Sequence, residues 1–122
     1  DSALLHRLAD RLGPWTLSGP ARQVAGHALA NTAWQKNQST RINDAGVRLQ
    51  LLIQRTVTTD GPIQSTGLFS TFRLDHAEGF FAHMASRGIL VRLFREESLI
   101  RIGIAADHEW KRLQHALNDW QP

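Results

Sequence analysis

A chain of 122 residues can form one compact core but is too short for two ordinary domains, and its apolar fraction of 42% and charged fraction of 20% are ordinary for a globular protein. The absence of cysteine excludes disulfides, thiolate catalysis and cysteine-based zinc sites. The formal net charge is +3, and all 14 basic residues except Lys36 and Lys111 are arginines, a bias that suits carboxylate or phosphate recognition but also arises from a GC-rich genome.

Three helices are predicted in the first half of the chain. Four leucines recur at helical spacing in residues 1–12, and a Gly-Pro pair ends this helix. Ser18 is placed to cap a second helix, which has a proline in its first turn. A third helix is expected to start at Asn31 and Thr32 and to continue to about residue 55, because the apolar pattern persists that far.

Strands and two further helices are predicted in the rest of the chain. Asp75 and Glu78 have the spacing of a capping box for a helix that Gly88 closes. Asp107 is placed to cap a final helix. The strand segments, rich in β-branched and aromatic residues, are residues 55–59, 66–74, 89–94 and 99–104. This order predicts an α+β fold in which helices cover a small, largely antiparallel sheet.

An arginine interrupts the last of these strands. Arg101 lies in the segment SLIRIGIA, whose other strand residues are mostly apolar. The short loop REES separates this strand from the preceding one, so the two are predicted to form an antiparallel hairpin. If Phe94 lies opposite Leu99, Arg92 lies directly opposite Arg101 and both side chains share one face of the sheet. A slip of one residue would place them on opposite faces.

Two like charges directly opposite each other on a sheet are destabilising, by a few tenths to about 1 kcal/mol. Two explanations are open at this point. An acidic side chain from elsewhere could neutralise Arg92 and Arg101. Alternatively, the two guanidinium groups could converge on an anionic ligand that carries a carboxylate, a phosphate or one of each.

Other kinds of site have weaker support. The six histidines show no metal-ligand spacing, so no metal is expected, and the scattered arginines with few aromatics between them argue against a nucleic-acid partner. No apolar run approaches the roughly 18 residues of a membrane span, and no secretory signal is present, so we expect a cytoplasmic protein without a membrane partner. Ser18 has no G-x-S-x-G context, which favours a helix cap over a nucleophile.

Four segments resemble, in order and spacing, the C-terminal part of the aspartate-aminotransferase-like enzymes of fold type I, which depend on pyridoxal phosphate. They are RLGPWTLSGPARQVAGHALANTAWQ, TGLFSTFRL, ASRGILVRLF and LIRIGIAADHEWKRLQHAL. The stretch GPWTLSGPA favours the branch of the threonine-phosphate decarboxylases of cobalamin biosynthesis, which is itself similar to the histidinol-phosphate aminotransferases.

This resemblance implies a domain organisation and a substrate site. Residues 31–122 would form the small C-terminal domain, and residues 1–30 the tail of the large domain with linking helices. Arg101 would hold the α-carboxylate of a phosphorylated amino acid and Arg92 would face its phosphate, although which anion belongs to which arginine stays open. Ser18 would lie near the substrate. Family members are homodimers.

The lysines depart from the family pattern. Catalysis in this family needs a lysine that binds the cofactor, in a serine-x-x-lysine setting followed by a glycine-rich arginine motif. Neither Lys36, in WQKNQS, nor Lys111, in EWKRLQ, has this setting. In relatives the lysine and the other cofactor-binding residues lie upstream of the segment that matches residues 1–12. We therefore expect a C-terminal fragment that holds no catalytic residue, binds no cofactor and is inactive by itself, from a parent enzyme that uses pyridoxal phosphate.

Three functions are carried forward. The resemblance implies that the parent decarboxylates L-threonine-O-3-phosphate. An aminotransferase of class I/II, of the histidinol-phosphate type, is the alternative on the same fold. A stand-alone module that binds an anion through Arg92 and Arg101, without catalysis, is the alternative outside the enzyme family.

Overall fold

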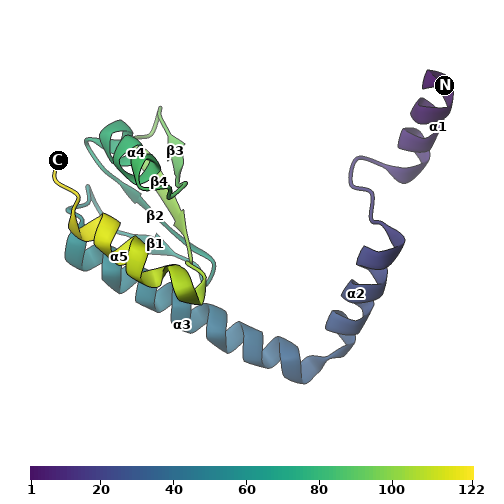
Figure 1. Ribbon diagram of the computed structural model, residues 1–122, viewed down its shortest axis with the longest axis horizontal. Coiled ribbons are helices and arrows are strands. Elements are labelled where there is room, and N and C mark those ends of the chain that lie inside the picture. Colours follow the sequence, from purple (N-terminus) through teal and green to yellow (C-terminus); the bar gives the residue numbers. More distant parts are fainter. The chain divides into compact units, whose positions relative to one another are not determined.

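The computed structural model describes residues 1–122 and contains two compact units, an N-terminal unit (Asp1–Asn37) and a C-terminal unit (Gln38–Pro122). The helices of the chain are α1 (Ser2–Leu12), α2 (Gly19–Ala30), α3 (Thr32–Thr56), α4 (Ala77–Ser86) and α5 (Trp110–Asn118), the last preceded by a short 3₁₀ turn, η1 (Asp107–Glu109) (Figure 1). None of these helices is both long and apolar enough to cross a membrane.

The N-terminal unit consists of helices whose starts follow the predicted caps. The hydroxyl oxygen of Ser18 accepts a hydrogen bond from the backbone N–H of Ala21 at 3.3 Å, which confirms it as the cap of α2. The side chain of Asn31 accepts from the N–H of Trp34 at 2.9 Å and starts α3 in the same way. No residue of α1 or α2 is buried.

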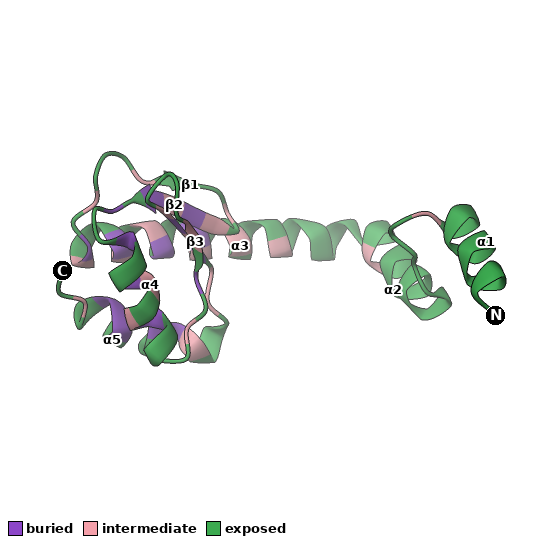
Figure 2. Ribbon diagram, turned by 90° about the horizontal axis from the view of Figure 1, so that it is seen from above, coloured by how far each residue is buried: buried purple, intermediate pink, exposed green.

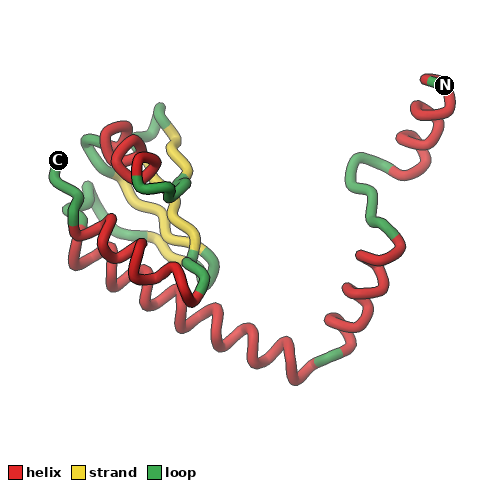
Figure 3. The backbone as a smooth tube through the Cα atoms, in the orientation of Figure 1, coloured by secondary structure: helices red, strands yellow, loops and turns green.

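The C-terminal unit is built around a four-stranded antiparallel sheet, which confirms the predicted α+β class. Its strands are β1 (Gln64–Ser65), β2 (Phe69–Arg73), β3 (Arg92–Phe94) and β4 (Leu99–Gly103), arranged in the order β1-β2-β4-β3 (Figure 3). All three strand pairs are antiparallel. The longer strands β2 and β4 are therefore central, and the short strands β1 and β3 form the edges.

One face of this sheet is buried and the other is open. Burial alternates along both central strands, with residues such as Phe72 and Ile100 buried and Arg73 exposed. The buried face packs on α4, α5 and the second half of α3, and Figure 2 shows the buried positions gathered there. The largest fully buried side chains are Leu49, Ile53, Phe72, Phe80, Met84, Ile100 and Leu117, with Ser70 the only buried polar one. This leaves the opposite face free to carry polar side chains.

The strand predicted over residues 55–59 is wrong. Residues up to Thr56 belong to α3, and the first strand is the two-residue β1. Ile53 and Val57 are both buried, and the N–H of Val57 donates to the carbonyl of Ile53 at 2.9 Å. The hydroxyl of Thr56 also donates to the carbonyl of Leu52 at 2.8 Å. Burial at helical spacing thus outweighs the β preference of the threonines and valine.

Two predicted helix caps are wrong in the same way. α4 starts after His76 without a side-chain cap, and Glu78 instead accepts from Arg95 at 2.5 Å. Asp107 lies in η1 without capping it, and its carboxylate accepts from Arg41 at 2.6 Å. In both cases a carboxylate of the predicted cap is bound to an arginine distant in sequence instead of to the start of its helix.

The predicted end of α4 at Gly88 is confirmed. Gly88 has φ of 69°, in the left-handed region that favours glycine. Its N–H donates to the carbonyl of Ala85 at 2.9 Å, and the N–H of Ile89 donates to the carbonyl of Met84 at 3.0 Å. These two bonds form a Schellman motif and turn the chain from α4 toward β3.

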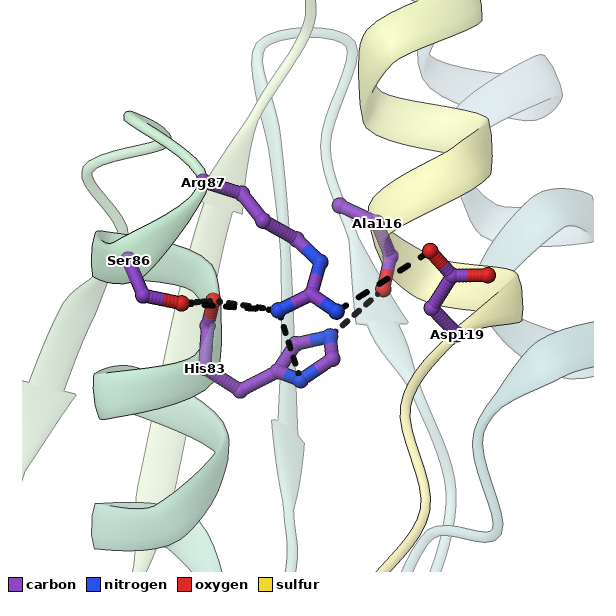
Figure 4. Close-up of polar contacts among 5 residues, drawn as sticks. All are labelled: His83, Ser86, Arg87, Ala116 and Asp119. Atoms are coloured by element: carbon purple, nitrogen blue, oxygen red, sulfur yellow. Dashed lines mark hydrogen bonds and ion pairs between the residues drawn. The ribbon is translucent and has the colours of Figure 1, made fainter.

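A histidine joins α4 to the end of α5 (Figure 4). The Nε2 of His83 lies 2.8 Å from the carbonyl oxygen of Ala116, and its Nδ1 lies 3.2 Å from the Nη1 of Arg87. A carbonyl only accepts and a guanidinium only donates, so the ring carries its hydrogen on Nε2. Nη2 of Arg87 in turn lies 3.9 Å from the carboxylate of Asp119. The contact occupies one of the last carbonyls of α5, which have no partner within the helix.

Candidate functional site

The open face of the sheet places the two predicted arginines side by side. Phe94 pairs with Leu99 and Arg92 pairs with Arg101 in the β3–β4 ladder, so the register predicted from the loop length is confirmed. Thr71 of β2 lies directly opposite Arg101 on its other side. Because directly opposed residues share a face, Arg101 occupies the centre of the open face and Arg92 lies next to it on the edge strand.

The hairpin turn fixes this register. Ser98 adopts φ of 48°, and its N–H donates to the carbonyl of Arg95 at 3.2 Å. The carbonyl of Ser98 also accepts from the N–H of Leu74, at 3.0 Å, which attaches the turn to the end of β2. A left-handed residue held from both sides in this way leaves little freedom for the strands to slip.

Phenylalanine rings lie against both guanidinium groups. The Cζ of Arg101 is 5.1 Å from the ring centroid of Phe69 and 5.8 Å from that of Phe94. The Cζ of Arg92 is 5.0 Å from the same Phe94 ring. The face of an aromatic ring attracts a cation, with a contribution of about 0.5–1 kcal/mol at exposed sites. Phe94 therefore contacts both like charges of the pair.

No carboxylate of the C-terminal unit neutralises the pair. Neither Arg92 nor Arg101 takes part in any of the ion pairs, whereas the neighbouring Arg95 is bound to Glu78. Within the C-terminal unit, the acidic partner that the first explanation requires is therefore not present. Arg101 is partly buried and Arg92 is exposed, and the donors of both remain available. The arrangement suits the binding of an anion.

An open pocket of about 730 Å³ lies over this part of the sheet. Both arginines line it, together with Phe69 and Gly103 from the open face. The remaining lining residues are Leu68, Phe81, Leu90, Val91, Leu93 and Arg95. The pocket combines apolar walls with two uncommitted guanidinium groups, which is the composition of a site for a small anionic molecule.

Ser18, the third predicted site residue, belongs to the N-terminal unit. Its hydroxyl is engaged in capping α2. The structure thus gives Ser18 a role in the helix, and the substrate contact implied by the resemblance stays a prediction.

The residues of the C-terminal unit do not fit a covalently bound pyridoxal phosphate at this pocket. Its one lysine, Lys111, lies on α5 and lines a different pocket. Lys36, the other lysine of the chain, belongs to the N-terminal unit. There is also no group of three or more histidine, cysteine, aspartate or glutamate side chains placed to hold a metal ion.

Three residues of the site were not singled out from the sequence. Phe69, Phe94 and Gly103 share the open face with Arg101 because they lie an even number of residues from it or opposite such positions. The signal was present in the alternation of the strands. Only the pairing of β2 with β4, which are far apart in the chain, identifies Phe69 and Gly103 as direct partners.

Comparison with curated proteins identifies a relative of this chain. No family model matches the chain. It is 37% identical over 115 residues to a threonine-phosphate decarboxylase of Pseudomonas aeruginosa, a match that covers 93% of this chain and 34% of the relative. The chain thus spans about a third of the length of that relative. The resemblance predicted from the sequence is confirmed, and the chain is related over nearly its whole length to a threonine-phosphate decarboxylase.

Proposed function

We propose that residues 31–122 are the substrate-clamping C-terminal small domain of a decarboxylase that uses pyridoxal phosphate and acts on L-threonine-O-3-phosphate in cobalamin biosynthesis. Residues 1–30 would be the tail of the large domain and its linking helices. The observation that carries the proposal is the pair formed by Arg92 and Arg101, which lie opposite each other on an open face without a carboxylate partner. The name of the relative supports the choice of substrate.

The chemistry of threonine phosphate matches this pair. The molecule carries a carboxylate and a phosphate, and each accepts two parallel hydrogen bonds from a guanidinium group. Arg101 lies on a central strand and is held between two aromatic rings, so it suits the carboxylate, which must be fixed beside the bond that breaks. Arg92 is exposed on an edge strand and suits the larger phosphate.

The contribution of this chain is therefore orientation. A ligand held at both anionic ends has one preferred position, and such positioning supplies a large part of the catalysis in a bound complex. The cofactor carries the chemistry of carbon dioxide loss in enzymes of this kind. Because the C-terminal unit offers it no suitable lysine, the proposal places cofactor attachment elsewhere in the parent protein.

The first test uses the gene product that contains this chain, purified with pyridoxal phosphate. After borohydride reduction, its intact mass should increase by one reduced cofactor, and it should release carbon dioxide from L-threonine phosphate. Cofactor uptake without carbon dioxide release, together with amino-group transfer from histidinol phosphate to 2-oxoglutarate, would support the aminotransferase instead.

A stand-alone anion-binding module is the second candidate, because the pocket lined by Arg92 and Arg101 suits an anion and contains no lysine. It predicts that the gene product binds threonine phosphate or inorganic phosphate but gains no cofactor mass. Loss of that binding in Arg101→Gln would show that the arginine pair is responsible.

The proposal also includes a cytoplasmic, homodimeric parent. The leucines of α1 are exposed in the N-terminal unit, which supports packing against further protein surface. Light scattering on the purified gene product measures the oligomeric state directly, and a monomer would contradict this part of the proposal.

A further inference from the structure

A glycine lies beside Arg101 on the open face of the sheet. Gly103 is two residues further along β4, so it shares the face of Arg101, and it pairs directly with Phe69. It also lines the pocket that contains both arginines. Because position 103 has no side chain, the open face has free space next to Arg101 at the end of β4.

The fold does not require glycine at this position. The φ of Gly103 lies outside the left-handed region, in contrast to Gly13, Gly61 and Gly88. The ladder runs without a bulge from the Gly103 pair to the Leu99 pair. A Cβ atom built on Gly103 would lie 3.8 Å from its nearest neighbour, the carbonyl oxygen of Leu68, which is an ordinary contact.

At Gly46, in the same unit, the fold does require glycine. A Cβ atom there would lie 2.8 Å from the carbonyl oxygen of Thr66 and 2.9 Å from the Cα of Gly67. No comparable contact exists at Gly103. Glycine in a strand is less stable than a residue with a side chain, and Gly103, the last residue of β4, lies at no bulge and meets no close backbone contact, which leaves the approach of a ligand as the reason for it.

We infer that Gly103 is a determinant of substrate binding, because it leaves room for the anionic group that Arg101 binds. This inference rests on the proposed function and deepens it, because it assigns the space beside the guanidinium to the bound amino acid phosphate. A side chain at position 103 would share the face with Phe69 and Arg101 and would narrow the pocket that these residues line. Binding would weaken while the sheet would stay intact.

The test compares Gly103→Ala and Gly103→Val with the wild-type gene product, loaded with pyridoxal phosphate. Gln64→Val is the matched control, because Gln64 lies in the same row as Arg101 on the open face but does not line the pocket. We expect Gly103→Val to raise KM for L-threonine phosphate at least about tenfold, with a smaller rise for Gly103→Ala, since extra atoms in a fitted site cost binding. We expect kcat to change less than about threefold, because the interaction lost is shared by ground and transition states.

Thermal unfolding and equilibrium binding of L-threonine phosphate complete the experiment. The midpoint temperature of thermal unfolding of both Gly103 variants should equal or exceed that of wild type. Gln64→Val should keep the wild-type KM. An unchanged KM in Gly103→Val would overturn the inference while leaving the proposed function intact. A lowered midpoint in both Gly103 variants would also overturn it, because the glycine would then serve the fold. Wild-type protein that neither binds nor decarboxylates threonine phosphate would overturn the proposed function and this inference with it.

Discussion

At the residue scale, the arginine pair favours the binding of an anion at some cost in the stability of the fold. Arg92 and Arg101 lie opposite each other without a carboxylate, so the folded chain bears a repulsion that an anionic ligand would relieve. Phe69 and Phe94 offset part of it through their ring faces. Such local conflicts are typical of functional sites, because a fold selected for stability alone would not keep them.

Removing one charge of the pair should therefore change binding much more than stability. For Arg92→Gln we expect the free energy of unfolding to change by less than about 0.5 kcal/mol in urea titrations, because the relief of the like-charge repulsion and the loss of the contact with the Phe94 ring oppose each other. We expect the affinity for L-threonine phosphate to fall roughly tenfold to a hundredfold by calorimetry, the loss of one charge-assisted contact. Arg55→Gln, which removes an exposed arginine of α3 outside the pocket, should leave the affinity unchanged. A fall of more than about 1 kcal/mol in the free energy of unfolding of Arg92→Gln would mean that the arginine supports the fold.

Phe94 should be energetically coupled to Arg92. Phe94→Leu keeps an apolar side chain but removes the ring face, and we expect a loss of about 0.5–1 kcal/mol in the free energy of unfolding. The loss should shrink in the Arg92→Gln background, and the double-mutant cycle built from urea titrations gives the difference. Phe94→Tyr retains the ring and should behave as wild type. Additive effects of the two substitutions would show that the ring packs without attracting the cation.

At the element scale, local sequence patterns predicted the β3–β4 hairpin and the end of α4 but not how two helices start. The β3–β4 hairpin followed from the short loop and the alternation of its strands, and Gly88 ended α4 as its left-handed conformation predicts. The capping box of Asp75 and Glu78 and the cap assigned to Asp107 were wrong, and the carboxylates of Glu78 and Asp107 are instead bound by Arg95 and Arg41. A sequence pattern shows the spacing of neighbouring residues. It does not show that the fold places an arginine of a distant helix beside a carboxylate.

The contact between α3 and the turn before β2 gives an element-scale prediction. Gly46→Ala should raise helix propensity by about 1 kcal/mol, yet its Cβ would meet backbone of residues 66–67 at 2.8–2.9 Å. Overpacking against backbone costs about 1–3 kcal/mol, so we expect a net loss of stability in thermal or urea unfolding.

Gly79→Ala is the control for this change. Gly79 lies in α4, and a Cβ there would lie 3.5 Å from the ring of Trp120, which is an ordinary contact. This variant should be as stable as wild type or more stable. If Gly46→Ala were equally stabilising, α3 and the turn would have to separate more easily than their close approach indicates.

At the scale of the whole molecule, the two units differ in how much apolar burial stabilises them. The C-terminal unit has a continuous apolar core, whereas no residue of α1 or α2 is buried. Isolated helices shorter than about 12–15 residues are marginal in water, and α1 has 11 residues and α2 has 12. The N-terminal helices therefore depend on packing that their own unit does not supply.

Hydrogen exchange of the 122-residue chain should separate the units. We expect amides of residues 1–30 to exchange within seconds, and those of β2, β4 and α5 to exchange through global unfolding, as measured by mass spectrometry. Attachment to the rest of the proposed parent should protect residues 1–30. Equal protection of α1 and β4 in the isolated chain would contradict this description.

The lengths of the outer strands have a consequence for aggregation. β1 and β3, the two edges of the sheet, contain two and three residues. Unpaired edge backbone is the template on which chains add to one another in fibrils, and very short edges offer little of it. Phe69 and Phe94 can therefore remain on the open face, where they contact the arginines, without promoting aggregation. The short edges give neighbouring molecules few backbone groups from which to extend a cross-β stack.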